Sequence, residues 1–179
     1  MMCFTVQLDR ANQRGRAERG FTLIEILIVV VILGILAAIV IPQFTSAAQG
    51  ARETSLKETV AHVRSQITVY KSQHRDVAPG IAPGATTATA SVFLDQMTLY
   101  TDESGNTNAT ATATFKYGPY LPAQPKNPLS NLTTMTIVNG TGSLPAADNS
   151  TGWIYKPETL EFAPNSTGND IQGAAFVSY

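Results

Sequence analysis

One carboxylate, Glu25, lies within the most apolar stretch of this 179-residue chain. Positions 26 to 41 carry no polar side chain, and no Lys or Arg occurs between Phe21 and Gln49. A carboxylate at the centre of a helix in hydrocarbon costs about 3 kcal/mol on insertion scales and rather less near the end, so Glu25 indicates a function and needs a cationic partner. A free α-amine at Phe21, created by cleavage after Gly20 and contributed by a neighbouring copy, would supply one. The alternative is a signal anchor that tolerates a Glu near the membrane surface.

The residues around Glu25 resemble the type III signal of type IV pilins and type II secretion pseudopilins. The resemblance covers residues 19 to 42, where a leader ending in Arg-Gly is followed by FTLIEILIVVVILGILAAIVIP. It implies that a prepilin peptidase cuts between Gly20 and Phe21 and N-methylates Phe21. It also implies that Glu25 pairs with the amine of an adjacent subunit during assembly.

The apolar segment is long enough to cross a membrane. Of the 21 residues from Phe21 to Ile41, 18 are apolar, and as a helix they span about 30 Å. This core exceeds that of a cleaved secretory signal. Four arginines precede it, so the positive-inside rule keeps residues 1–20, the predicted leader, in the cytoplasm. We therefore expect the subunit in the inner membrane before assembly, with its C-terminal head in the periplasm or outside the cell.

A second helical stretch follows at residues 43–76. Its apolar residues recur at steps of three and four, which is typical of an amphipathic helix: Leu56, Val60, Val63, Ile67 and Tyr70. Pro42 lacks a backbone donor and should kink or open the helix between the two stretches. The family resemblance further implies that the helix melts between Gly34 and Pro42 in filaments, which agrees with the backbone freedom of Gly. We predict one long, bent helix from Phe21 to about Gln73.

Residues 77–179 are predicted to form a loop-rich head, because nine of the ten prolines lie there. A short helix is expected at Ser91–Tyr100, with Pro157 and Glu158 in the turn of a hairpin whose residues Trp153 and Tyr155, or else Ile154, pack on the apolar stripe. The candidate strands are Thr134–Val138, Gly152–Lys156, Thr159–Ala163 and Ala174–Ser178. The fold class is α+β and type IV pilin-like: a long N-terminal helix, hydrophobic then amphipathic, packed on a small C-terminal antiparallel sheet.

The head also resembles the post-helix region of major pseudopilins, where YGPYLPAQPKNPLSN and then GWIYKPETLEF match a loop that precedes a terminal hairpin. Major pseudopilins commonly hold calcium in a C-terminal loop, and Asn165, Asn169 and Asp170 could provide oxygen ligands at such a place. A solvated Asn/Gly turn is the alternative. Apart from this calcium, no cofactor is expected. Five sequons in the head are candidates for glycosylation: Asn108, Asn131, Asn139, Asn149 and Asn165.

No pattern for catalysis, zinc or nucleic acid is present in the sequence. Cys3 is the single cysteine, which excludes an intrachain disulfide and leaves the two histidines without a zinc-site spacing. The chain lacks a nucleophile elbow, a phosphate loop and a metal-binding helix, so we expect no enzyme and no catalytic residue. Glu158 and Glu161 are expected to be solvated hairpin positions. Charged residues make up 14% of the chain and net to −1, which argues against a nucleic-acid partner.

The predicted function is a structural subunit of a helical extracytoplasmic filament, either a type II secretion pseudopilus or a type IV pilus. The resemblance implies these partners: copies of the same chain, the prepilin peptidase, an inner-membrane assembly platform and motor, and minor pilins or pseudopilins. Residues 43–75 carry a net charge of +3 and residues 76–179 one of −5, which favours docking of one head near another stem. The alternative is a membrane-anchored monomeric binding or adhesion protein with an outward-facing head.

Overall fold

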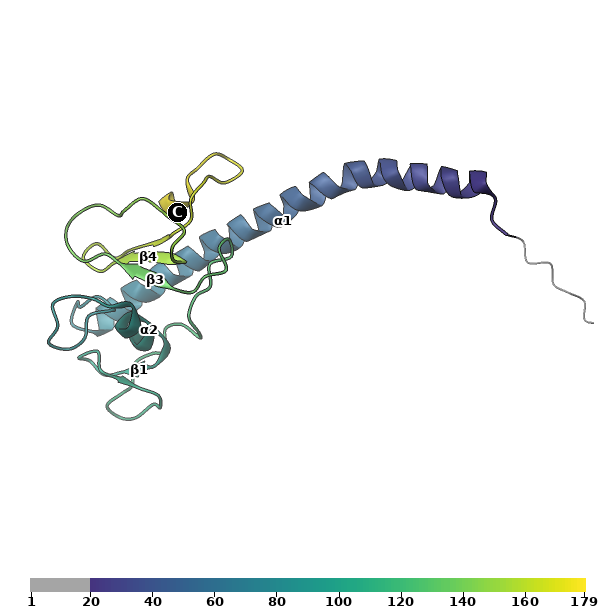
Figure 1. Ribbon diagram of the computed structural model, residues 1–179. Helices are drawn as coiled ribbons and strands as arrows, with labels where there is room; N and C mark the ends of the chain where they lie inside the picture. The colour runs from purple at the N-terminus through teal and green to yellow at the C-terminus, as the bar shows by residue number, and fades with distance from the viewer. Residues whose placement is uncertain (1–19) are drawn as a thin grey trace, which may run out of the picture. The chain divides into compact units, whose positions relative to one another are not determined.

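The computed structural model describes residues 20–179 (Figure 1). Of the predicted leader, only Gly20 belongs to the described residues. The chain divides into two compact units, the first ending at Phe44 and the second running from Thr45 to Tyr179. The boundary falls within a single helix, α1, so the two units share one continuous element.

Helix α1 (Leu23–Gln73) has 51 residues and corresponds to the long helix predicted from the sequence. It begins two residues later than expected, because residues 20–22 are not helical. The chain stays helical through Gly34 and through Pro42, which lies inside the helix. The melting implied for this stretch concerns the filament and remains a prediction.

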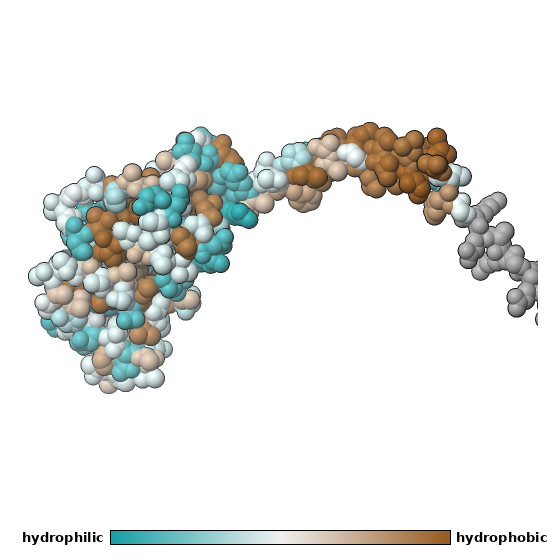
Figure 2. Space-filling view, in the orientation of Figure 1, coloured by the Kyte–Doolittle hydropathy of each residue, from teal (hydrophilic) through white to brown (hydrophobic). Residues whose placement is uncertain are grey.

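The first unit exposes nearly all of its apolar side chains. Exposed fractions between Leu23 and Phe44 run from 43% at Val40 to 90% at Leu23. In Figure 2 the hydrophobic colour covers this half of α1 almost without interruption. The helix is long and apolar enough to cross a membrane by length and composition, and none of its most apolar window is buried.

In the second unit, α1 supplies one wall of the hydrophobic core. The predicted stripe is confirmed, since its five residues are at most 2% exposed: Leu56, Val60, Val63, Ile67 and Tyr70. They share a core cluster with Trp153 and Tyr155, whereas Ile154 lies outside that cluster although it is 1% exposed. Side chains alternate between the two faces of a strand, so Trp153 and Tyr155 face α1 and Ile154 faces away. Of the two predicted alternatives, the one with Trp153 and Tyr155 on the apolar stripe is confirmed.

A three-stranded sheet carries those aromatic residues. Its central strand β4 (Trp153–Lys156) pairs antiparallel with β5 (Glu161–Pro164), across a turn that begins with Pro157 and Glu158. This is the predicted hairpin. Strand β3 (Met135–Ile137) lies on the other side of β4 and pairs with it in parallel.

Two details of the predicted sheet are wrong. The sheet is mixed rather than antiparallel, because β3 and β4 run in the same direction. Residues 138–152 form a connection long enough to return the chain from the end of β3 to the edge of the sheet where β3 began, and β4 starts there. Segment Ala174–Ser178 is not a strand: it contains the 3₁₀ turn η1 (Phe176–Ser178). Gly173 has a φ of +88° just before it, and Asn169 bridges Ala175, so the chain turns back instead of extending.

The remaining elements close the far side of the core. Helix α2 (Ala90–Thr98) corresponds to the short helix expected at Ser91–Tyr100, but it ends two residues earlier, because Tyr100 pairs with Asn108 as part of a strand. The Thr89 hydroxyl caps the start of α2 by accepting a hydrogen bond from the backbone N–H of Val92. Strands β1 (Tyr100–Thr101) and β2 (Thr107–Asn108) form a small antiparallel pair that the sequence did not suggest.

Candidate functional site

The first turn of α1 is held by two reciprocal hydrogen bonds between Thr22 and Glu25. The backbone N–H of Glu25 donates to Thr22 Oγ1 at 3.3 Å, and the backbone N–H of Thr22 donates to Glu25 Oε2 at 3.4 Å. This is a capping box, which satisfies donors that a helix N-terminus otherwise leaves free. The carboxylate also lies at the positive end of the helix dipole. In the single subunit, Glu25 therefore has partners within its own turn.

The sequence reasoning missed this arrangement, although its signal was present. The spacing Thr-x-x-Glu before an apolar run is the usual sequence signature of a capping box. In the sequence alone the carboxylate is a charge in hydrocarbon, which requires a cationic partner, whereas in the structure the backbone N–H of Thr22 already bonds it. The capping box adds a role in helix initiation to the assembly role predicted for Glu25.

The predicted cleavage point lies just before this turn. Gly20 and Phe21 are exposed and not helical, and the exposed fraction of Phe21 is 78%. Together with Thr22 and Glu25 they line a hollow at the helix end. The structure thus brings Gly20, Phe21 and Glu25 together, and leaves the peptide bond between Gly20 and Phe21 reachable.

The exposed apolar half of α1 is the largest feature of the site. Monomeric soluble proteins rarely expose contiguous apolar patches of more than a few hundred Å². Gly34 and Pro42 both lie in this half, and no atom outside the helix backbone comes within 4 Å of the position a Gly34 Cβ would take. The described residues of the first unit therefore offer a bare helix that needs a lipid or protein environment.

Several basic side chains of the second half of α1, and Arg75 just beyond its end, are bonded within the head. Ion pairs join Lys57 to Asp170 at 3.2 Å, Lys71 to Asp76 at 3.9 Å and Arg75 to Glu103 at 2.9 Å. Two backbone carbonyls, those of Phe162 and Tyr179, accept hydrogen bonds from Arg64. Among the described residues of this stretch, Arg52 is the basic side chain with no such contact shown. Docking between subunits through net charge stays a prediction, with Arg52 as the basic side chain to test.

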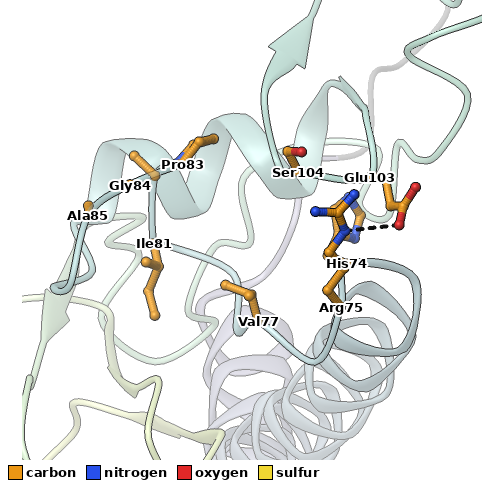
Figure 3. A pocket seen from close by; sticks show the side chains of 10 residues that line it. His74, Arg75, Val77, Ile81, Pro83, Gly84, Ala85, Glu103 and Ser104 are labelled. Atoms are coloured by element: carbon orange, nitrogen blue, oxygen red, sulfur yellow. Dashed lines mark hydrogen bonds and ion pairs between the residues drawn. The ribbon is translucent and has the colours of Figure 1, made fainter.

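Figure 3 shows the pocket where α1 ends, lined in part by His74, Arg75 and Glu103. Both nitrogens of His74 are engaged, Nδ1 with the carbonyl of Tyr70 at 2.7 Å and Nε2 with Thr101 Oγ1 at 2.9 Å. Burial lowers the pKa of His74 below its ordinary value. The Arg75 guanidinium beside Glu103 holds the pKa of that carboxyl below its usual range. His74, Arg75 and Glu103 are thus bonded to groups of the protein where α1 ends.

The three calcium candidates lie near the C-terminus with different surroundings. Asn165 is 2% exposed, and its Oδ1 accepts a hydrogen bond from the backbone of Asp148 at 2.8 Å. Asn169 is exposed. Asp170 has a buried carboxylate with four hydrogen-bond donors around it, the nearest being the hydroxyl of Tyr179 at 2.6 Å. Within residues 20–179, no three His, Cys, Asp or Glu residues form a metal-binding group.

The five sequons differ in accessibility. Asn131, Asn139 and Asn149 are exposed and Asn108 is half-buried. Asn165 is buried, and its Nδ2 donates to side-chain oxygens of the 148–151 turn. A glycan on that nitrogen would break these bonds, and the Nδ2 atoms of Asn139 and Asn149 also donate hydrogen bonds. Glycosylation of the five sequons remains a prediction.

Comparison with known proteins places the chain in a family. Residues 15–41 match the family model of the prokaryotic N-terminal methylation motif. The chain is 37% identical over 65 residues to the ComG operon protein 3 homolog of Bacillus licheniformis, covering 36% of this chain and 67% of that protein. This chain belongs to the family of type IV pilins and pseudopilins.

Two further relatives represent the two branches of that family. The type II secretion system core protein G of Pseudomonas aeruginosa is 48% identical over 56 residues, or 31% of this chain and 39% of that protein. The type IV narrow pilus major component PilA5 of Thermus thermophilus is 41% identical over 59 residues, or 33% of this chain and 51% of that protein. The chain thus matches less than two fifths of the length of its core protein G relative. No solved structure matches the chain.

Proposed function

We propose that this chain is the structural subunit of a helical extracytoplasmic filament, cut by a prepilin peptidase after Gly20 and assembled through the apolar half of α1. The observation that carries the proposal is the bare apolar helix with a capped carboxylate in its first turn. Before assembly the bilayer covers this helix, with the head in the periplasm or outside the cell. In the filament, the helices of neighbouring copies replace the lipid.

Glu25 changes partners in this scheme. In the single subunit its carboxylate is bonded to the backbone N–H of Thr22 by a long hydrogen bond of 3.4 Å. Cleavage after Gly20 turns the nitrogen of Phe21 into a charged amine. A neighbour's amine then offers Glu25 a charge-assisted bond, which is stronger than one from a neutral amide, especially where the surroundings exclude water. Assembly therefore neutralises a charge that the lipid disfavours.

Gly34 and Pro42 are the points at which α1 opens most easily. Relative to Ala, Gly within a helix costs about 1 kcal/mol and Pro about 3 kcal/mol. The helix between them is intact in the single subunit, so its melting requires neighbours that accept the freed backbone groups. We assign this change to assembly, together with the inner-membrane platform and motor that must supply the energy of extraction.

The choice between pilus and pseudopilus rests on the head. Many type IV pilins close a C-terminal loop with a pair of cysteines, and this sequence has Cys3 alone. The lack of that pair and the presence of the β4–β5 hairpin favour the pseudopilus. Minor pilins or pseudopilins are further expected partners. The alternative function is that of a membrane-anchored monomer that binds a ligand through its head. Both functions need the membrane anchor, and only the filament subunit is cut after Gly20 and polymerises.

The deciding experiment separates the charge of Glu25 from its capping role. Gln at this position of a capping box still accepts from the backbone, so Glu25→Gln keeps the cap and removes the charge. We expect Glu25→Gln and Glu25→Val to insert into the membrane normally and to yield few or no sheared filaments, and Glu25→Asp to retain partial assembly. Glu58→Gln, on the exposed face of α1 in the head, is the matched control and should assemble normally. Wild-type filament yield from Glu25→Gln would refute the proposed ion pair and return weight to the anchored monomer.

A further inference from the structure

The C-terminal loop, residues 165–175, is held against one face of α1. Glu53 and Lys57 lie one helical turn apart and point to the same side. Glu53 Oε2 accepts a hydrogen bond from the backbone of Ile171 at 3.3 Å, and Lys57 Nζ donates to Asp170 Oδ2 at 3.2 Å. The Lys57 ammonium also lies 4.4 Å from the centre of the Tyr179 ring. The loop is thus bonded to the helix through residues more than one hundred positions apart.

The carboxylate of Asp170 has no lone pair left for another ligand. Its Oδ1 accepts from the backbone of Gln172 at 2.9 Å and of Ala174 at 2.8 Å. Its Oδ2 accepts from the Tyr179 hydroxyl at 2.6 Å as well as from Lys57. These bonds, led by that from Tyr179, lower the pKa of Asp170 to about 2. The side chain of Asp170 is 2% exposed, so these donors replace water as its partners.

This donor set does not fit calcium. The ion takes six to eight oxygen ligands, and it needs carboxylates whose lone pairs are free. The charge of Asp170 is already neutralised by the Lys57 ammonium group, which lies 3.2 Å from Oδ2. That group would repel a calcium ion bound to the same oxygen. The Oδ1 of Asn165 is likewise occupied by the backbone of Asp148. Two of the three predicted ligands, Asn165 and Asp170, therefore already accept hydrogen bonds from protein donors, and only Asn169 is exposed.

We infer that Lys57 acts as a built-in cation that closes the C-terminal loop onto α1, so that this subunit needs no calcium at the position where the resemblance implies one. The ammonium bridges Asp170 and the Tyr179 ring, and Glu53 fixes the next backbone amide. The inference concerns the stability of the head and does not depend on whether the chain forms filaments.

The test is hydrogen exchange of the C-terminal loop in the full mature chain, purified in detergent. The amides of Ile171, Gln172 and Ala174 report directly on the contacts described. In the wild type we expect the same exchange rates with millimolar calcium and with an excess of chelator. Lys57→Met should raise these rates about three- to tenfold, the lower end reflecting the 48% exposure of the Lys57 side chain. Tyr179→Phe should also raise them, because it removes one donor and keeps the ring.

Two controls make the result decisive. Lys126→Met makes the same chemical change at an exposed lysine for which no ion pair is shown, and should leave the loop unchanged. Lys57→Arg keeps the charge and should preserve most of the protection. The fluorescence of Trp153, the single tryptophan and fully buried, checks that each variant is folded. The inference is overturned if chelator raises exchange in the wild type, or if Lys57→Met exchanges as slowly as the wild type.

Discussion

Ile67 offers the sharpest test of how the head is held together. It lies on the buried face of α1, is 0% exposed and belongs to the core cluster that also contains Trp153 and Tyr155. Replacing it by Ala removes three carbon atoms from a site where the helix meets the sheet. The mutation therefore asks whether α1 supplies the core or merely runs beside it.

The expected loss follows from the burial of that side chain. Three methyl or methylene groups contribute about 2.4 kcal/mol in transfer free energy. An unrelaxed cavity of roughly 80 Å³ adds about 2 kcal/mol, and the better helix propensity of Ala returns about 0.4 kcal/mol. Ile67→Ala should thus lower the free energy of unfolding by about 2 to 4 kcal/mol. For a head of roughly 135 residues, this corresponds to a fall in Tm of about 7 to 14 °C.

The assay is thermal unfolding of the mature chain in detergent, followed by the fluorescence of Trp153. Val69→Ala is the control, because Val69 lies two residues further along the same helix and is 38% exposed. That variant should shift Tm by less than about 3 °C. If Ile67→Ala behaved like Val69→Ala, the packing of α1 on the sheet would not stabilise the head and the reasoning would be refuted.

Three further predictions follow from the sites described. Mass spectrometry of the mature protein should find Phe21 as the first residue, with one added methyl group. A bulky replacement of Gly20 should leave uncut precursor in the membrane. An intact Met1 in the mature protein would contradict cleavage after Gly20. Burial lowers the pKa of His74, so the unfolded chain binds a proton at this residue more readily than the folded chain does. Tm should therefore fall as the pH is lowered from about 7.5 to about 5.5, and the fall should be smaller in His74→Gln. Equal slopes in the two proteins would show that another group titrates. If subunits dock through charge, Arg52→Gln and high salt should each reduce the filament yield. An unchanged yield in both experiments would show that charge does not contribute to docking.

Much of this protein was determined by local sequence. The apolar run after Phe21, the lone Glu25 and the steps of three and four from Leu56 to Tyr70 specify the long helix and its two environments, because helix periodicity and hydrophobic length are properties of neighbouring residues. The β4–β5 hairpin follows for the same reason, since a tight turn joins two adjacent strands. The capping box of Thr22 and Glu25 was also readable from spacing alone.

The tertiary structure decided the features that depend on distant partners. The parallel pairing of β3 with β4 depends on how residues 138–152 cross the sheet, which no local pattern encodes. The sequence around Asp170 allows a calcium ligand, because the residues beside it in the chain include no cationic partner. Its actual partner, Lys57, is 113 positions away, and the two meet only because the core packs the end of the chain against α1. The same folding buries Asn165 and brings Lys57, Arg64 and Arg75 to partners in the head, and these contacts join residues too far apart in the sequence for a local pattern to encode.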